Sequence, residues 1–508
     1  MNSLIPLLII IPLATAFIIP IIGKITNIFA KTFTPVIMLV LSFLSISLLL
    51  SSHQESYIVG GWQPVNEIPI GIYLVLDGFS KLVICIISVI GCLVSFYAIS
   101  YISKYTSENN FYALFCLMIA GMNGVVLSGD IFNLFVFLEI SVIASYALVA
   151  FGVGKNELEA SFKYQVLGNI ASFLILFSIA LLYWQTKTLN IADISDILKT
   201  NESSVFLKFT QIMLITGFGL KAAIIPFHAW LPDAHSSAPS PVSAMLSGVL
   251  IKAIGVYVLI RLFFNMFIIN YEIGVVITVL GTLSMVIGSL LAINQWDIKR
   301  LLAYSSISQI GYIMLGFGVG MMVIAKGGKE SIAILAIAGS LYHMVNHAVF
   351  KGLLFLGAGA IEYRTNTRDM NQLGGLSENM PITSTTSLGA SMSISGIPPF
   401  NGFFSKLIII IAAVQGKFYL LAALAIVVSI ITLAYFLKYQ KSVFYGENKN
   451  YKDIKEVPFV MSFSMIVLVI LCLGLSLLAI PSIREVILDQ AVNSLINVDE
   501  YINLVIKY

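Results

Sequence analysis

Charged residues are scarce in this sequence. Only 10% of its 508 residues are Asp, Glu, Lys or Arg, whereas 58% are hydrophobic, and the mean hydropathy is +0.96. A soluble protein of ordinary composition carries about 25% charged residues. Apolar runs long enough to cross a bilayer recur along the whole chain. Because the alternating strands of a closed β-barrel are absent, the sequence predicts an all-α, polytopic membrane protein.

Signals for other functions are also missing. The net charge is +3 and no block of basic residues occurs, which argues against a nucleic-acid partner. The four cysteines lie in apolar runs without metal-ligand spacing, which favours packing over metal binding. No cysteine cluster, haem motif or nucleotide loop is present. We therefore expect no metal, no cofactor and no redox or hydrolytic site of its own in this chain. The cysteines are Cys85, Cys92, Cys116 and Cys472.

Apolar segments of sufficient length predict about 14 transmembrane helices. Residues 4–22 are interpreted as the first span and not as a signal peptide, since no positive region precedes them and no small-residue cleavage site follows. The longest polar connections, 185–210 and 438–457, leave no room for a soluble domain. The expected spans are 4–22, 34–51, 79–100, 111–128, 131–152, 164–184, 211–231, 241–265, 270–294, 301–325, 331–360, 382–415 (interrupted), 417–437 and 458–480.

Lys and Arg are unevenly divided between the two sets of loops. The side with more of them is predicted to be cytoplasmic, which places both termini on the non-cytoplasmic side of the cell (inner) membrane. The tail 483–508 has apolar residues at helical spacing and is expected to lie along the membrane surface. The richer side has Lys24, Lys31, Lys104, Lys155, Lys299, Arg300, Arg364, Arg368, Lys438, Lys441, Lys449, Lys452 and Lys455; the other has Lys187, Lys199, Lys326, Lys329 and Lys417.

Two apolar segments are interrupted by proline in a similar way. The stretch 225-IPFHAWL-231 contains Pro226, and 398-PPFNGFF-404, five expected spans later, contains Pro399. Corresponding interrupted helices in two halves of a chain are typical of inverted-repeat transporters. We expect spans 4–8 and 9–13 to form two inverted five-helix repeats, with broken seventh and twelfth helices. The expected divisions are 1–110 (helices 1–3), 111–265 (first repeat), 266–440 (second repeat) and 441–508 (last helix and tail).

Ionisable side chains recur inside these apolar segments. A charge at the centre of a lone helix costs about 2.5–3.5 kcal/mol on insertion, so such residues indicate function. The candidate proton-translocating residues are Glu139, Lys221, Lys252, His343, His347, Lys351 and Lys406, and the supporting residues are His228, Asp233, His235, Pro226 and Pro399.

These buried groups have two interpretations. They can form structural ion pairs, but one acid, Glu139, cannot neutralise Lys221, Lys252 and Lys406. Alternatively, burial weakens the hold of a lysine on its proton and a nearby carboxylate strengthens it, so the lysine exchanges protons when its partner moves. With histidines between them, such lysines make a proton wire through a hydrated interior. The prolines unwind helices where backbone groups meet water or side chains instead of lipid.

Two smaller questions stay open at this point. His228 can equally be a core histidine whose hydrogen bonds are satisfied. Asp77 and Lys81, one turn apart near a helix start, are expected to pair with each other.

Three long segments resemble the signature of the proton-translocating, antiporter-like membrane subunits. That family includes the antiporter-like subunits of respiratory complex I, the D subunit of the Mrp-type Na+/H+ antiporter, and equivalents in membrane-bound nickel–iron hydrogenases. The resemblance extends over essentially the whole chain. The segments are 219-GLKAAIIPFHAWLPDAHSSAPSPVSAMLSGVLIKAIGVY-257, 297-DIKRLLAYSSISQIGYIMLG-316 and 393-SISGIPPFNGFFSK-406.

The resemblance implies a fold and a role for particular residues. The fold is one of about 14 helices with two inverted five-helix repeats. Glu139 matches the fifth-helix glutamate and Lys221 its seventh-helix lysine partner. Lys252 matches the eighth-helix lysine that leads toward the central relay, and Lys406 matches the ionisable residue of the twelfth helix.

Two points of the resemblance are less direct. The eleventh-helix relay histidine is either His343 or His347; the second, one turn from Lys351, is preferred. The chain departs from the most distal complex I subunit, because its tail after residue 480 is too short for the long lateral helix of that subunit.

Three functions compete at this point. The leading hypothesis is a proton (or cation/proton) translocating subunit of an Mrp-type antiporter, or of a complex I-type dehydrogenase or hydrogenase. Its partners would be other integral membrane subunits and the lipid bilayer. The alternative is a stand-alone secondary transporter of a small solute, and expression of the chain alone would separate the two. An inert scaffold is the third, and the buried charges argue against it.

Overall fold

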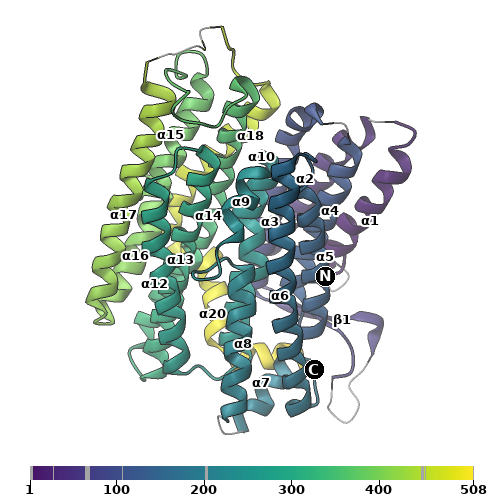
Figure 1. Cartoon of the computed structure of the whole chain (residues 1–508). Coiled ribbons are helices and arrows are strands. Elements are labelled where there is room, and N and C mark those ends of the chain that lie inside the picture. The colour runs from purple at the N-terminus through teal and green to yellow at the C-terminus, as the bar shows by residue number, and fades with distance from the viewer. Residues whose placement is uncertain are drawn as a thin grey trace.

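Long helices run side by side between two ends of the molecule (Figure 1). The computed structural model describes residues 4–26, 28–62, 69–105, 107–200, 204–447, 451 and 453–506. Lys449 and Lys452, used above to predict orientation, lie outside the described residues.

The described residues of the first half of the chain form eleven α-helices and an irregular helical stretch. They are α1 (Leu7–Ile22), α2 (Ile28–Leu50), α3 (Gly78–Tyr101), α4 (Glu108–Leu127), α5 (Ile131–Val149), α6 (Lys155–Thr186), α7 (Ile191–Thr200), α8 (Val205–Lys221), α9 (Trp230–Ser237), α10 (Ser240–Met245), the π-helical segments Leu246–Leu250 and Lys252–Val256, and α11 (Tyr257–Asn265). Short 3-10 turns cover Val59–Gly61 and Ile102–Lys104.

The second half continues the bundle and ends in short helices. They are α12 (Tyr271–Ile293), α13 (Ile298–Ala325), α14 (Glu330–Thr365), α15 (Pro381–Ser395), α16 (Asn401–Gln415), α17 (Tyr419–Gln440), α18 (Phe459–Gly474), α19 (Pro481–Arg484), α20 (Gln490–Ile496) and α21 (Val498–Val505). π turns follow α17 (Lys441–Tyr445) and α19 (Glu485–Asp489), and a 3-10 turn (Leu475–Ala479) follows α18.

The expected all-α membrane architecture is confirmed. Within the described residues, 11 helical segments are long and apolar enough to cross a membrane, and α1 and α16 are shorter apolar helices. Both proline sites interrupt a helix, since α8 ends before Pro226 and α15 ends before Pro399. The full number of 14 spans remains a prediction.

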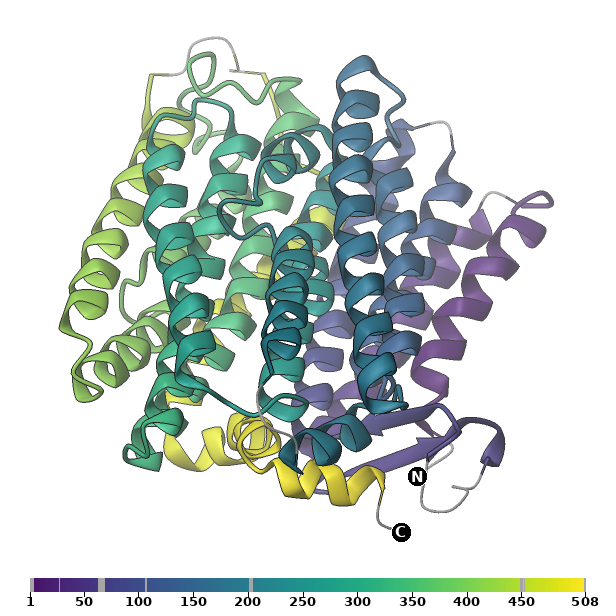
Figure 2. The same cartoon turned by 60° about the horizontal axis from the view of Figure 1, so that its bottom comes forward.

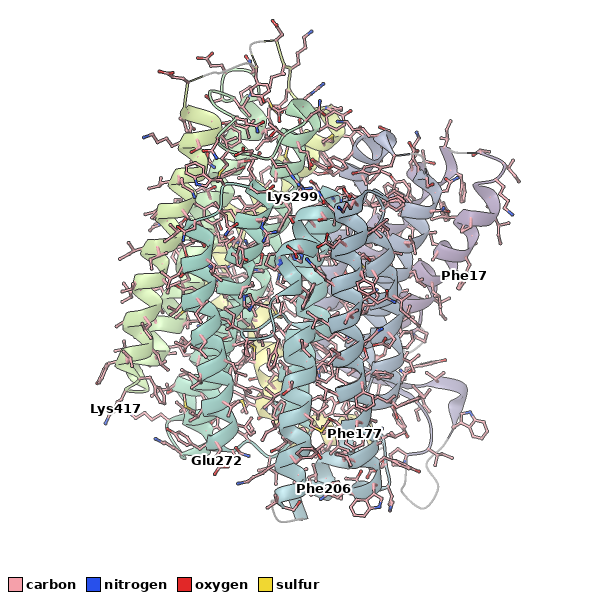
Figure 3. All side chains as sticks on the ribbon, in the orientation of Figure 1. Phe17, Phe177, Phe206, Glu272, Lys299 and Lys417 are labelled. Atoms are coloured by element: carbon pink, nitrogen blue, oxygen red, sulfur yellow. The ribbon has the colours of Figure 1, made fainter. Side chains whose placement is uncertain are left out.

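The surface of the bundle matches a membrane environment. Phe17 is 64% exposed and Phe177 43% exposed, and both project from its sides (Figure 3). Lys299 lies near one end of the molecule, and Glu272 and Lys417 lie near the other end (Figure 3). Apolar side chains thus face outward between two ends that carry charges, as lipid contact requires.

A small β-hairpin differs from the sequence prediction, in which no strands were expected. Strands β1 (Glu55–Ile58) and β2 (Tyr73–Leu76) pair antiparallel. Each has four residues, which is too short for an alternating pattern to stand out in a sequence this apolar. The hairpin lies at the same end of the molecule as α7 (Figure 1).

The C-terminal segment, which is expected to lie along the membrane surface, packs against one end of the bundle (Figure 2). α20 and α21 cross beneath the bundle toward α7 and the β-hairpin (Figure 2, yellow). The Ser56 hydroxyl donates to the Leu504 carbonyl at 2.9 Å, and Lys199 pairs with Asp499 at 2.5 Å. Tyr501 is only 3% exposed, so the tail contributes to the core.

A buried ion pair holds the tail to the helices above it. Arg261 on α11 donates through two nitrogens to both carboxylate oxygens of Asp77, at 2.6 and 2.7 Å, and both residues are at most 2% exposed. Asn265 accepts from Arg261 at 3.1 Å and donates to the Ser494 carbonyl on α20 at 2.8 Å. The Tyr501 ring lies 5.1 Å from the guanidinium. Two-pronged geometry of this kind is the strongest form of the Arg–carboxylate pair.

The expected pairing of Asp77 with Lys81 is therefore wrong. The Lys81 ammonium points the other way and donates to the carbonyls of Ser51 and His53. Asp77 also caps α3 by accepting the N–H of Ser80 at 2.8 Å, which leaves its outer face to Arg261.

We predict that Arg261→Leu destabilises the protein by about 3–5 kcal/mol, because the Asp77 carboxylate is then buried without a partner. The free energy of unfolding in detergent measures the effect. Adding Asp77→Asn removes the buried charge but keeps the cap, so the double variant should regain part of the loss. A single variant as stable as the wild type would show that the pair does not anchor the tail.

Candidate ion-translocation site

The first break separates α8 from α9 and exposes backbone groups that a membrane cannot hydrate. Side chains form hydrogen bonds with these backbone groups. The Trp230 indole donates to the Leu220 carbonyl at 3.0 Å, and Ser284 accepts the N–H of Ile225 at 2.9 Å. The Trp230 ring also stacks on Tyr164 with centroids 4.2 Å apart. The break is thus a stable structure, held by side chains of other helices.

At the end of α8 the structure brings together the acid and the lysine expected to meet there. Lys221 Nζ lies 3.6 Å from Glu139 Oε1. Ser172 on α6 joins them: its hydroxyl donates to Glu139 at 2.5 Å and accepts from Lys221 at 2.9 Å. The Lys221 side chain is 1% exposed and that of Glu139 is 24% exposed. The neutral Ser172 hydroxyl therefore bridges the pair, and solvent reaches the pair only on the Glu139 side.

Lys252 lies in the π-helical stretch between α10 and α11. Its ammonium donates to the carbonyl of Ser247, five residues earlier, and Lys252 is 3% exposed. Gly255 packs so close to the first break that a Cβ on it would lie 2.7 Å from Ala222, the neighbour of Lys221. No hydrogen bond or ion pair joins Lys221 to Lys252 within the described ranges. The helix that carries Lys252 therefore packs directly against the end of α8, although the two lysine side chains have different partners.

Lys351 and His343 occupy one buried face of α14. Lys351 donates to the Leu302 carbonyl at 2.8 Å and to the Ser305 hydroxyl. The His343 ring bonds on one side to Gln309, at 3.2 Å, and on the other to Ser405 on α16, at 3.0 Å. Both residues are fully buried. His343 thus links α13 to the helix that carries Lys406.

His347 lies between these two residues and is fully buried. Neither of its ring nitrogens has a hydrogen-bond partner in the part of the chain that the structure describes. Lys252, Lys351, His343 and His235 are ionisable neighbours of its ring. Such a ring can accept or give a proton in several directions, which fits a central relay.

The second break, between α15 and α16, places Lys406 near a helix start. Asn346 on α14 and Asn401 on α16 hold the break through amide hydrogen bonds of 2.8 and 2.9 Å. Lys406 donates to the Ile394 carbonyl at 2.8 Å, and its ammonium lies 4.8 Å from the Tyr312 ring centroid. Lys406 forms no ion pair with any described residue. A pocket of about 240 Å³ opens beside it, lined also by Gly396 and Ser429.

The three supporting polar residues divide into different environments. Asp233 on α9 pairs with Lys163 at 3.0 Å and with Arg300 at 2.7 Å. His235 is fully buried near Lys252 and Lys351, and no described residue hydrogen-bonds its ring. His228 lies in the break and is half-buried, with its Nδ1 unbonded to any described residue.

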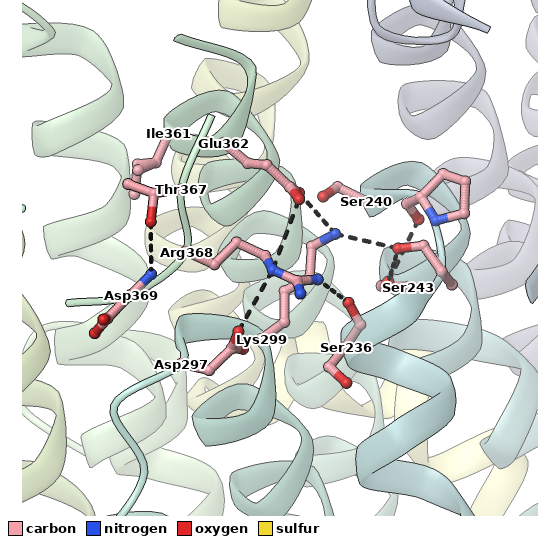
Figure 4. A network of polar contacts seen from close by, with 12 residues as sticks. Ser236, Ser240, Ser243, Asp297, Lys299, Ile361, Glu362, Thr367, Arg368 and Asp369 are labelled. Atoms are coloured by element: carbon pink, nitrogen blue, oxygen red, sulfur yellow. Dashed lines mark hydrogen bonds and ion pairs between the residues drawn. The ribbon is translucent and has the colours of Figure 1, made fainter. Parts of the chain in front are cut away.

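Asp233 lines a pocket together with Asp297 and Arg368, which belong to a polar network at one end of the bundle (Figure 4). Lys299 pairs with Glu362 at 2.9 Å, and Arg368 bridges Asp297 and Glu362 at 3.4 and 3.7 Å. Arg368 also donates to the Ser236 carbonyl on α9. The network therefore ties the short helix α9 to α13 and α14.

Sequence reasoning missed the neutral members of the site. These residues hydrogen-bond to the ionisable groups or hold the second break. The sequence did not distinguish them, because similar neutral polar side chains occur throughout the apolar helices. Among the described residues, no three His, Cys, Asp or Glu side chains gather as metal ligands. The missed residues are Ser172, Ser305, Gln309, Asn346, Asn401 and Ser405.

Known families match most of the chain. Residues 128–432 match the family described as "NADH:quinone oxidoreductase/Mrp antiporter, TM", and residues 62–112 match "NADH-Ubiquinone oxidoreductase (complex I), chain 5 N-terminus".

Individual relatives are similar over comparable lengths. The chain is 35% identical to the D subunit of the Na(+)/H(+) antiporter of Alkalihalophilus pseudofirmus, over 78% of this chain and 77% of that protein. It is 36% identical to the N subunit of the NADH-quinone oxidoreductase of Desulforudis audaxviator, over 75% and 74%.

Solved structures share the fold over nearly the full length. A chain of the Mrp complex from Dietzia sp. DQ12-45-1b has a TM-score of 0.89 at 25% identity, covering 99% of both chains. A chain of the membrane-bound sulfane sulfur reductase, an archaeal respiratory membrane complex, has a TM-score of 0.89 at 29% identity, also covering 99% of both. The expectation from the sequence motifs is confirmed: this chain belongs to the family of antiporter-like membrane subunits shared by NADH:quinone oxidoreductases and Mrp antiporters.

Proposed function

We propose that this chain is the proton-translocating subunit of a multisubunit membrane complex, of the type represented by Mrp antiporters and NADH-quinone oxidoreductases. The observation that carries the proposal is the Glu139–Ser172–Lys221 arrangement beside a helix break. A carboxylate beside a buried lysine stabilises the protonated lysine, and separation of the two releases the proton. The relatives named above are all subunits or chains of such membrane systems.

The proposed route runs through the interior from α8 to α16. Protons pass from Lys221 to Lys252, then through His347 and Lys351 to His343, and leave through Lys406. Support comes from the burial of these groups and from the proximity of His343 to both Lys252 and Lys406. Because Lys221 and Lys252 are not joined by a direct hydrogen bond between described residues, the step between them requires water.

Two inverted repeats, residues 111–265 and 266–440, organise this route. Support comes from matching ends of α6 and α14, whose following residues are 186-TKTLN-190 and 365-TNTRD-369. In both segments the first threonine hydroxyl donates a hydrogen bond of 2.8 Å to the carbonyl four residues earlier in its helix. In both, the last residue forms an isolated β-bridge to an aspartate that caps a helix: Asn190 to Asp130 and Asp369 to Asp297. One site adjoins α7 and the other adjoins Lys299, at opposite ends of the bundle (Figures 1 and 3).

The end that carries Lys299 and Arg300 faces the cytoplasm in this proposal, as the loop charges predict. The termini and the β-hairpin then face the other side of the cell membrane. Other integral membrane subunits surround the chain, and whether Na+ is exchanged for protons is decided in the assembled complex.

We predict that Glu139→Gln lowers proton translocation at least about hundredfold, because Gln keeps the shape of the side chain but cannot carry a charge. Proton movement in inverted membrane vesicles containing the complete complex measures the rate. Glu272→Gln, a change in an exposed partner of Lys208, is the matched control and should leave the rate unchanged. Translocation by the Glu139→Gln complex at the wild-type rate would exclude the switch.

We predict that Lys406→Ala blocks translocation, whereas Lys406→Glu retains part of it. Glutamate can also bind and release a proton at this position, but alanine cannot. The same vesicle assay compares the two variants at equal amounts of assembled complex. If both variants lose activity equally, the positive charge is what the site requires, and proton exchange at Lys406 is wrong.

We predict that His343→Ala and His347→Ala each lower the rate about tenfold or more, as expected for the loss of a proton-transfer group. Because the two groups act in series, their delays add, so the double variant should be at most about twofold slower than the slower single variant. His53→Ala, at an exposed histidine, serves as the control. A double variant whose losses multiply would mean that both histidines act on one and the same transfer step, which contradicts a serial route.

A further inference from the structure

The hydroxyl of Tyr146 on α5 is buried and has no hydrogen-bond partner in the described parts of the chain. Tyr146 as a whole is 6% exposed. A buried polar group without a partner costs about 1–3 kcal/mol, so its presence calls for an explanation. Phenylalanine would fill the same space without that cost.

The hydroxyl lies against a gap in the surface of α6. A Cβ on Gly168 would lie 1.8 Å from the Tyr146 oxygen, so the hydroxyl occupies the space that a larger residue would fill. Gly168 is one turn from Ser172, whose hydroxyl bridges Glu139 and Lys221. Tyr146 is also two turns from Glu139 on α5, on the same side of that helix.

A continuous row of small or hydroxyl-bearing residues on α6 leads from this point to the end of the bundle. Ala160, Tyr164, Gly168 and Ser172 follow at intervals of four residues, and all are buried. Ala160 lines a pocket of about 290 Å³ together with the charged residues of the network around Asp233. From Ala160 to Ser172 the helix rises about 18 Å, and Tyr146 meets the row two thirds of the way along.

The line of contact between α5 and α6, here called the seam, includes other polar contacts. The hydroxyls of Ser145 and Tyr164 lie 3.0 Å apart, and Ser161 donates to the Tyr146 carbonyl at 2.8 Å. The seam is thus lined with groups that hydrogen-bond, although it lies between two otherwise apolar helices.

We propose that the seam between α5 and α6 supplies protons from the pocket at Asp233 to the Glu139–Lys221 pair, and that the Tyr146 hydroxyl is the relay on this path. The inference rests on the proposed function and extends it to the step before Lys221. A phenol hydroxyl both donates and accepts hydrogen bonds, as a relay must. The rise of one helical turn from Gly168 to Ser172, about 6 Å, is short enough for a single water to bridge.

The transfer leaves Tyr146 unchanged. A proton arriving from the pocket side bonds to the phenol oxygen while the original hydroxyl proton leaves toward the Glu139 carboxylate. One O–H bond forms as another breaks, and the tyrosine stays neutral before and after. The proton then resides on the Glu139–Lys221 pair.

The test is Tyr146→Phe in the complete complex, compared with Tyr112→Phe. Tyr112 on α4 is the control because its hydroxyl is also buried and unpartnered among the described residues. We expect Tyr146→Phe to lower translocation about tenfold or more, the loss of a proton-transfer group. Thermal stability should stay equal or rise in both variants, because each loses a buried unsatisfied hydroxyl. Tyr112→Phe should translocate at the wild-type rate.

Three outcomes would overturn the inference. A Tyr146→Phe complex with the wild-type rate excludes the relay. Equal losses in both variants, or a loss that follows reduced thermal stability, would mean that packing is responsible. The Glu139→Gln variant tests the proposed function separately from the relay. If the Glu139→Gln complex translocates protons normally, the proposed function is wrong. If that complex is inactive while the Tyr146→Phe complex is fully active, only the relay is wrong.

Discussion

The hydrogen bonds of buried lysines govern this structure. An ammonium group inside a membrane protein needs acceptors, but a permanent carboxylate partner would hold its proton. Lys252, Lys351 and Lys406 all donate to backbone carbonyls, of Ser247, Leu302 and Ile394. Backbone carbonyls stabilise the charge without adding an opposite one, so the lysines are satisfied and still free to exchange protons. A regular helix offers few such carbonyls, because each already accepts from the residue four positions later.

Two of these three acceptors, the carbonyls of Ile394 and Ser247, lie in irregular parts of the fold, whereas Leu302 lies within the regular helix α13. The Ile394 carbonyl is available because α15 ends at Ser395, and the last carbonyls of a helix have no partner within it. The Ser247 carbonyl lies in a π-helical segment, where the ordinary α-helical pairing is displaced. Lys221 differs, since it has both a hydroxyl and the Glu139 carboxylate nearby. Among these four lysines, the acid partner belongs to the one beside the first break.

The sequence predicted the helical class and both breaks, and it singled out the charged residues of the candidate site, because charges and prolines stand out in apolar runs. It did not predict the partners of these charges. The residues around Arg261 are apolar, and its partner Asp77 is 184 positions away in the sequence. Only the folded structure shows that the two residues pair. Ser172 and Gln309 look like any other polar residue of a packed helix. The π-helical turns could not be predicted from the sequence, because they depend on the packing of neighbouring helices against α10 and α11.

The π-helical stretch has a consequence for how Lys252 responds to motion. Its acceptor belongs to its own helix, so donor and acceptor travel together when that helix shifts. Lys351 has its acceptors on α13 and Lys221 its hydroxyl partner on α6, so those bonds stretch whenever adjacent helices slide. Lys252 combines this intrahelical acceptor with a neighbouring histidine, His347, whose ring is unbonded among the described residues. The hydrogen bond of the Lys252 ammonium is therefore kept when helices shift, whereas the bonds of Lys351 and Lys221 change length with each rearrangement of the bundle.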